Sequence, residues 1–67
     1  MMNAKKIGEI LVKLRGNKPI VKVAGDLKIS PSALSMYENG ERIPRDNIKI
    51  RIAAYYQKPI QDIFFTE

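Results

Sequence analysis

The chain has 67 residues, which suits one small domain, and its 45% hydrophobic content is typical of a globule rather than a disordered tail. Twelve Lys and Arg against seven Asp and Glu give a net charge of +5, and the sequence contains neither Cys nor His. These absences exclude disulfides, the usual Cys/His zinc sites and Cys- or His-based nucleophiles. The longest apolar run, residues 52–56, is far shorter than the roughly 20 residues of a membrane span. We therefore expect no membrane partner, no metal and no cofactor, and no small-molecule ligand is evident.

The positive charge is unevenly distributed along the chain. Residues 1–28 carry seven basic and two acidic residues, whereas residues 29–67 carry five of each. The whole excess therefore lies in the N-terminal part, which favours a polyanionic partner, either nucleic acid or an acidic membrane surface.

Helical spacing of apolar residues begins near the N-terminus. Asn3 is a good N-cap and Gly16 is a good residue to follow a helix, so we predict the first helix between them. Pro19 opens a second helix, because first-turn N–H groups need no helical partner. The predicted buried faces are Ile7, Ile10, Leu11 and Leu14 in the first helix, and Ile20, Val23, Ala24 and Leu27 in the second.

The third helix has the clearest start. Ser30 is a natural N-cap, Pro31 follows at the first helical position, and Gly40 is placed to end the helix. Its predicted inward residues are Leu34 and Tyr37. The second and third helices (about residues 19–27 and 31–39) are joined by a turn of about three residues, so they must cross steeply. Such a unit, over residues 19–39, presents its second helix as a ridge that fits a DNA major groove roughly 12 Å wide.

Two further helices complete the predicted fold. Pro44 prevents helix continuity, so a fourth helix begins near Asp46 and runs through Tyr56, and a short fifth helix follows Pro59. Their apolar positions are Ile48, Ile52, Ala53, Tyr55 and Tyr56, then Ile60, Ile63 and Phe64. No strand alternation is visible. We predict an all-α fold: a compact bundle of five short helices, with residues 1–67 forming a single domain.

A specific motif runs through the second and third helices and the loop after them. It reads Val23-Ala24-x-x-Leu27-x-Ile29-Ser30-x-Ser32-x-Leu34-Ser35-x-Tyr37-Glu38-Asn39-Gly40-x-Arg42-x-Pro44. With this motif the chain resembles the lambda-repressor-like helix-turn-helix regulators, the Cro/repressor or xenobiotic response element family. The resemblance spans nearly the whole chain, since it also covers Leu14-Arg15, Ile52-Ala53 and Ile60-x-Asp62-Ile63.

The resemblance implies roles for individual residues. Those expected on or near the DNA are Ser30, Ser32, Ala33, Ser35 and Met36 of the third helix, Asn39 after it, and Arg42 and Arg45 in the following loop. Arg15 and Glu38 match a pair that ties the first helix to the third. Independently of the family, Lys18, Lys22 and Lys28 flank the helix pair and are expected to attract phosphate without regard to sequence. Ser30 is also explained by N-capping alone, and Ser32 and Ser35 by exposure to solvent.

The chain departs from the family pattern at three places. Ile20 stands where a phosphate-contacting Gln is usual, and Lys28 stands at a turn position that is often Gly, where a left-handed residue would carry a Cβ penalty. Pro31 offers no side-chain donor, and no Arg, Gln or Asn follows at positions 32–36 for bidentate base recognition. We therefore expect hydroxyl contacts, apolar contacts with thymine methyl groups and DNA shape to share the specificity.

An aromatic cluster at the C-terminal end, Tyr55, Phe64 and Phe65, exceeds what so small a core can enclose. It is either a core edge or a dimer interface, and the family and the small size favour a homodimer, with a palindromic operator. The sequence thus predicts a cytoplasmic, bacterial or phage-encoded transcriptional regulator, a repressor and not an enzyme. The alternative is a protein-binding antirepressor or antitoxin-like module on the same fold. A nuclease using Glu38, Glu41 and Asp46 and a membrane-surface helix over residues 4–15 are less favoured.

Overall fold

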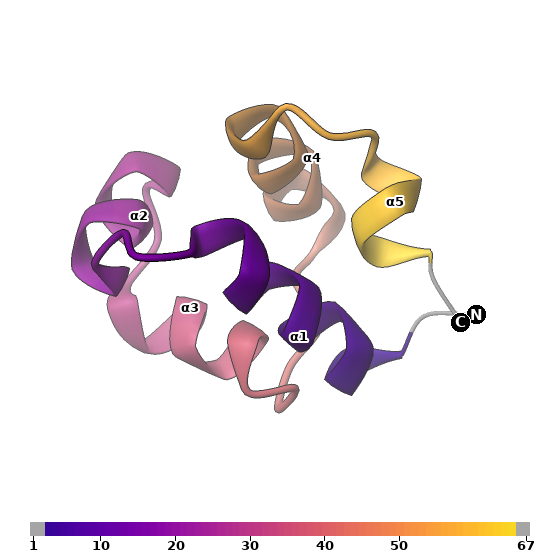
Figure 1. Cartoon of the computed structure of the whole chain (residues 1–67), viewed down its shortest axis with the longest axis horizontal. Coiled ribbons are helices and arrows are strands. Elements are labelled where there is room, and N and C mark those ends of the chain that lie inside the picture. The colour runs from indigo at the N-terminus through magenta and orange to yellow at the C-terminus, as the bar shows by residue number, and fades with distance from the viewer. Residues whose placement is uncertain (1–2, 66–67) are drawn as a thin grey trace.

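The computed structural model describes residues 3–65, which form five helices around one core (Figure 1). They are α1 (Ala4–Arg15), α2 (Ile20–Leu27), α3 (Pro31–Glu38), α4 (Asp46–Tyr56) and α5 (Ile60–Phe64). No strand occurs within residues 3–65. The predicted all-α bundle of five short helices is therefore confirmed.

The first helix is the centre of the arrangement. In Figure 1, α1 crosses the middle of the molecule, with α3 below it, α4 above it and α5 beside the end where it begins. α1 packs against both α3 and α5, α2 packs against α3 and α4, and α4 packs against α5. The helices enclose one core in a body of 29 × 22 × 21 Å.

Local capping explains where the helices begin and end. The side chain of Asn3 accepts the N–H of Lys6 at 3.1 Å, and that of Ser30 accepts the N–H of Ala33 at 3.0 Å. Gly16 and Gly40 follow α1 and α3 with φ of 58° and 75°, values that glycine adopts without a Cβ penalty. Sequence reasoning therefore located both helices correctly.

The second helix begins one residue later than predicted. Pro19 has extended backbone angles (φ −61°, ψ 142°), so it is the N-cap residue and its carbonyl accepts the first helical bond, from Val23 N–H at 3.2 Å. The third helix ends one residue earlier than predicted, at Glu38, and Asn39 is its C-cap residue. In both cases the flanking residue is half inside the helix, which sequence patterns do not distinguish from a helical position.

The core agrees with the predicted apolar faces. Its buried residues are Ile7 and Leu11 of α1, Val23, Ala24 and Leu27 of α2, Leu34 and Tyr37 of α3, Ile52 and Ala53 of α4, and Ile63 and Phe64 of α5. Ile10, Leu14, Ile20, Ile48, Tyr55, Tyr56 and Ile60 are only partly buried against it. None of the helices described within residues 3–65 is long and apolar enough to cross a membrane.

Two glycines allow α1 to lie directly on the C-terminal end of α3. A Cβ atom at Gly8 would collide with the backbone carbonyl groups of Glu38 and Tyr37. A Cβ atom at Gly40 would lie 2.9 Å from the Cα atom of Lys5, closer than real Cβ contacts. This close approach fixes the position of α3 relative to α1, and nothing in the sequence pattern indicated it.

Candidate nucleic-acid interface

The third helix has a buried inner face and an uncovered outer flank. Leu34 and Tyr37 point into the core and are 1% and 8% exposed. On the other side, Ser32 is exposed, and Ser35 and Met36 are partly exposed. Ala33 is also partly exposed and packs against the core edge. Within residues 3–65, this side of α3 is therefore left accessible at Ser32 and, in part, at Ser35 and Met36.

The N-terminal end of α3 is open to solvent but has few free donors. Ser30, Pro31 and Ser32 are all exposed. The side chain of Ser30 occupies the N–H of Ala33, and Pro31 has no N–H to offer. Of these first-turn groups, the N–H of Ser32 is left for an anion at the positive end of the helix dipole. Ser30 is therefore an N-cap, as N-capping alone would explain.

The turn between α2 and α3 contains a left-handed residue other than glycine. Lys28 has φ 59° and ψ 43°, so the Cβ penalty expected at this position is present. The N–H of Ile29 donates to Ala24 O at 3.0 Å, and the Nη1 atom of Arg51 donates to Leu27 O at 2.7 Å. These bonds satisfy carbonyl groups at the end of α2 and hold the turn. The side chain of Lys28 is exposed beside them.

Arg51 was missed by sequence reasoning. It lies on α4, 24 positions from the carbonyl that it binds, and is partly buried. Its position in the sequence carries no capping signal, because capping signals act within one helix turn. Only the packing of α4 on α2 brings the guanidinium to the turn.

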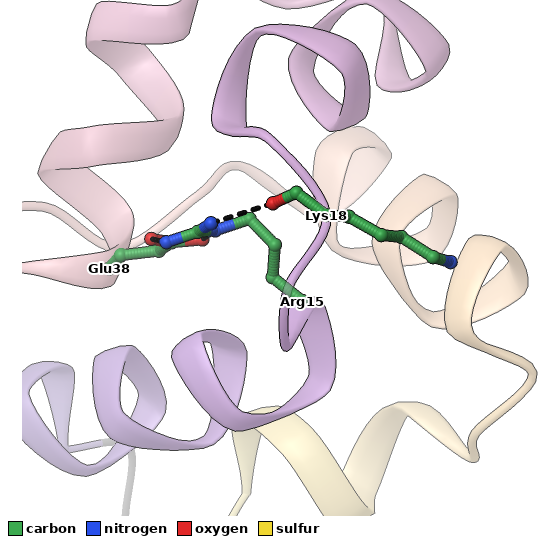
Figure 2. Close-up of polar contacts among 3 residues, drawn as sticks. All are labelled: Arg15, Lys18 and Glu38. Carbon is green, nitrogen blue, oxygen red and sulfur yellow. Dashed lines mark hydrogen bonds and ion pairs between the residues drawn. The ribbon is translucent and has the colours of Figure 1, made fainter.

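Arg15 and Glu38 form the predicted pair between α1 and α3 (Figure 2). Nε of Arg15 donates to Oε2 of Glu38 at 2.7 Å, and Nη2 donates to Oε1 at 3.0 Å. Nη1 of the same guanidinium donates to the carbonyl oxygen of Lys18 at 2.8 Å, which ties the α1–α2 linker to the pair. The hydrogen bond from Arg15 to Glu38 raises the pKa of Arg15. The carboxylate of Glu38 is therefore compensated and does not oppose a phosphate with a free negative charge.

Two of the predicted phosphate-binding lysines, Lys18 and Lys22, have partners within the domain. Nζ of Lys22 is 3.4 Å from Oδ2 of Asp26, which also accepts the hydroxyl of Tyr55 at 2.7 Å. Nζ of Lys18 lies 5.3 Å from the centre of the Tyr55 ring, a cation–π distance. The hydrogen bond between Tyr55 and Asp26 lowers the pKa of the carboxyl and raises that of the hydroxyl. Lys18 of the α1–α2 linker thus contacts α4, Lys22 pairs with Asp26 on α2, and Lys28 is at the turn before α3.

The loop after α3 presents two arginines to solvent. Arg42 and Arg45 are exposed, and neither has an ion-pair partner among residues 3–65. Pro44 between them is buried and anchors the loop to the protein. Asn39 at the end of α3 is exposed, and its side-chain amide donates to Glu41 at 3.3 Å. The loop therefore supplies uncompensated positive charge next to the outer flank of α3.

The predicted dimer cluster of Tyr55, Phe64 and Phe65 does not form one surface, and Phe64 was wrongly assigned to it. Phe64 is 0% exposed and lies in the core, because α5 packs this ring inward against α1 and α4. Tyr55 is on the side of α4 that faces α2. Of these three residues, Phe65 is the exposed one, at 52%, and its ring centre lies 5.7 Å from Nζ of Lys49. Ile50 on α4 is 62% exposed and was not predicted.

Within residues 3–65, no group of three or more His, Cys, Asp or Glu side chains is placed to hold a metal ion. Glu38 of the nuclease alternative is buried against Arg15. The side chains that the structure gathers around α3 are hydroxyls, a thioether and cations, which suit hydrogen bonding and charge attraction.

The comparisons with known proteins agree with this geometry. A helix-turn-helix family model matches residues 9–63, and curated proteins give no significant match. A solution structure of the SOS-response transcriptional repressor LexA from Eubacterium rectale is 21% identical, with a TM-score of 0.85 over 91% of this chain and 67% of that chain. Two crystal structures of the clp gene regulator ClgR from Corynebacterium glutamicum are 18% identical over 94% of this chain. Their TM-scores are 0.77 and 0.80, over 84% and 69% of those chains.

At these identities the solved structures show a common fold, and the family match covers most of the sequence. This chain belongs to the helix-turn-helix family of the Cro/repressor type.

Proposed function

We propose that this domain is a transcriptional repressor that binds a specific double-stranded DNA sequence as a homodimer, with α3 in the major groove. The observation that carries the proposal is the accessible outer flank of α3. Ser32 is exposed there and Ser35 and Met36 are partly exposed, whereas Leu34 and Tyr37 on the opposite side are buried. A helix that projects in this way fits the width of the major groove. Membership of the helix-turn-helix family supports the same role.

The charge around α3 favours contact with the DNA backbone. Arg42 and Arg45 are exposed on the loop after the helix, and Lys28 is exposed at the turn before it. Glu38, the acidic residue of α3, is compensated by Arg15. Cations on both sides of the helix would bind phosphates and set the position of α3 on the duplex, without selecting a sequence.

The outer flank suits limited direct recognition of bases. Ser32 and Ser35 each supply a hydroxyl that donates and accepts, and Met36 supplies an apolar surface for a thymine methyl group. None of these side chains makes the bidentate contacts that discriminate most strongly between bases. Sequence-dependent DNA shape, sensed through the positions of the arginines, is expected to carry a large share of the specificity.

The dimer is proposed on Phe65 after α5, which is 52% exposed, together with Ile50 of α4, which is 62% exposed. Burial of large apolar side chains is the main source of affinity at such a surface. A twofold dimer would place two copies of α3 about 34 Å apart, so each half-site of a palindrome would meet one subunit.

The test is a selection of bound duplexes from a random pool, followed by titration of the enriched duplex at several salt concentrations. A repeated, symmetric motif is expected. If a dimer meets about eight phosphates, the logarithm of the affinity should fall with the logarithm of salt concentration with a slope near −7. No enrichment, together with a flat salt response, would refute DNA binding and favour the protein-binding antirepressor or antitoxin-like alternative.

A further inference from the structure

An apolar groove lies between α1 and α5. It encloses about 270 Å³ and is lined by Ile10, Lys13 and Leu14 of α1, by Lys58 of the α4–α5 linker, and by Asp62 and Ile63 of α5. Ile10 and Leu14 are only partly buried, so the two helices do not close over their own apolar contact. The groove is therefore a preformed apolar surface that other parts of residues 3–65 leave open.

The groove faces away from the proposed DNA-binding surface. Gly8 and Arg15 of α1 contact α3 and, seven positions apart, share one face of the helix. At about 100° per residue, Ile10 lies about 200° around the helix from Gly8, and Leu14 lies about 240° from it. A ligand between α1 and α5 would thus leave α3 uncovered.

The charges around the groove indicate the chemistry of its ligand. Lys13 and Lys58 are exposed, and neither has an ion-pair partner in the part of the chain that the structure describes. These two lysines and one acidic residue, Asp62, line the groove, so its charged lining residues sum to a net positive charge. The floor consists of aliphatic side chains without hydrogen-bonding groups. A complementary ligand therefore joins an apolar chain to a negatively charged head.

The size of the groove limits the length of that chain. Taking roughly 30 Å³ for each water-sized unit, 270 Å³ corresponds to about nine units. We propose that the groove binds an aliphatic monocarboxylate of about eight to ten heavy atoms, with its chain against Ile10, Leu14 and Ile63 and its carboxylate beside Lys13 and Lys58. This site is independent of the proposed function, since it uses none of the residues assigned to DNA or to the dimer.

The test uses octanoate as the probe and methyl NMR of the whole chain as the readout. Saturable shifts are expected at the methyl groups of Ile10, Leu14 and Ile63, with those of Val21 and Ile43 unmoved. Octylammonium and octanol carry the same chain without the negative charge, and each is expected to bind up to about fivefold more weakly, as one exposed charge contact predicts.

A pair of double variants tests the two lysines. The variant Lys13→Gln/Lys58→Gln should lose the preference for octanoate over octanol. The variant Lys5→Gln/Lys6→Gln removes the same net charge from the far end of α1 and should keep the preference. The proposal would be overturned if octanoate produced no saturable shifts at the groove, if octanol bound equally well, or if both double variants behaved alike.

Discussion

Arg15 at the end of α1 and Glu38 at the end of α3 are 23 positions apart, yet they are joined by two parallel hydrogen bonds, at 2.7 and 3.0 Å. The side chain of Glu38 is only 4% exposed, whereas that of Arg15 is 21% exposed. The pair lies where Gly8 lets α1 approach the backbone of α3. It therefore sets the orientation of the proposed recognition helix on the rest of the domain.

We predict that removing both partners costs less than the two single removals added together. Arg15→Met would leave a buried carboxylate uncompensated and should lower the free energy of unfolding by about 2 kcal/mol, below the range for fully buried pairs because Arg15 is partly exposed. The double variant Arg15→Met/Glu38→Gln should lose less than the sum of the two single variants. Urea unfolding of all four proteins measures this coupling, and additive losses would contradict it.

Tyr56 should make the protein less stable at high pH. Its hydroxyl is buried without a hydrogen-bond partner among residues 3–65, and burial raises its pKa to about 12. Because the unfolded tyrosine loses its proton near pH 10, the folded state binds more protons between pH 10 and about 12. Stability is therefore full below pH 10 and falls as the pH rises through this window, by about 1 kcal/mol after allowance for partial exposure.

The variant Tyr56→Phe isolates this effect. It should remove the alkaline loss and should be neutral or up to about 1 kcal/mol more stable at pH 7, because it deletes an unsatisfied buried hydroxyl. The unfolding free energies of the wild type and the variant are measured from pH 8 to about 12. Both proteins contain the same lysines, so the effect of lysine titration cancels in the difference between them. Parallel curves for the two proteins would rule out the assigned role of Tyr56.

Lys28 should show opposite effects on stability and on DNA binding. The backbone of Lys28 is in the left-handed conformation, which glycine adopts without a Cβ penalty. Lys28→Gly should therefore raise the free energy of unfolding by about 0.5–1 kcal/mol, whereas Lys28→Ala should not. Both variants lose the same charge and should lower the salt slope of DNA binding by about one. Thermal unfolding and salt titration of the two variants separate backbone strain from phosphate contact. Equal stability of the two would argue against strain at this position.

Arg42 and Arg45 should each contribute the same amount to the affinity for every DNA sequence. Replacing either by Ala is expected to weaken binding uniformly and to lower the salt slope by about one per site. The matched control is Lys58→Ala, which removes the same charge from the exposed α4–α5 linker. An unchanged slope in an arginine variant would remove that residue from the set of phosphate contacts.

Substitution of Phe65 should affect dimerisation, whereas substitution of its neighbour Phe64 should affect stability. Phe65→Glu is expected to shift a dimer to monomers at micromolar concentration with little change in stability, because the side chain is half exposed. Phe64→Ala should cost about 3–5 kcal/mol of unfolding free energy, since its ring is in the core. Val12→Glu, at another exposed apolar residue, is the control for added charge. Sedimentation that finds the wild type monomeric would refute the dimer.

Sequence alone determined the helices and the face that each one buries. Asn3, Ser30 and Gly40 act within one turn of the helix ends at which they stand, so their effect does not depend on the rest of the chain. Apolar spacing likewise identified the inward faces, because burial follows the period of the helix. The Arg15–Glu38 pair was the long-range contact that could be predicted, and it came from resemblance to the family rather than from the local pattern.

The tertiary structure decided which neighbour each side chain meets. The approach of Gly8 to Glu38, the bond from Arg51 to Leu27 and the contact of Tyr55 with Asp26 each join positions about 24 to 30 apart. A periodic pattern shows that a residue faces inward or outward, but it does not contain the angles at which helices cross. For this reason Phe64 was assigned to an interface although it lies in the core, and the contact of Lys18 with the Tyr55 ring was not foreseen. Their surroundings depend on how α4 and α5 pack, which is set by the summed fit of many side chains.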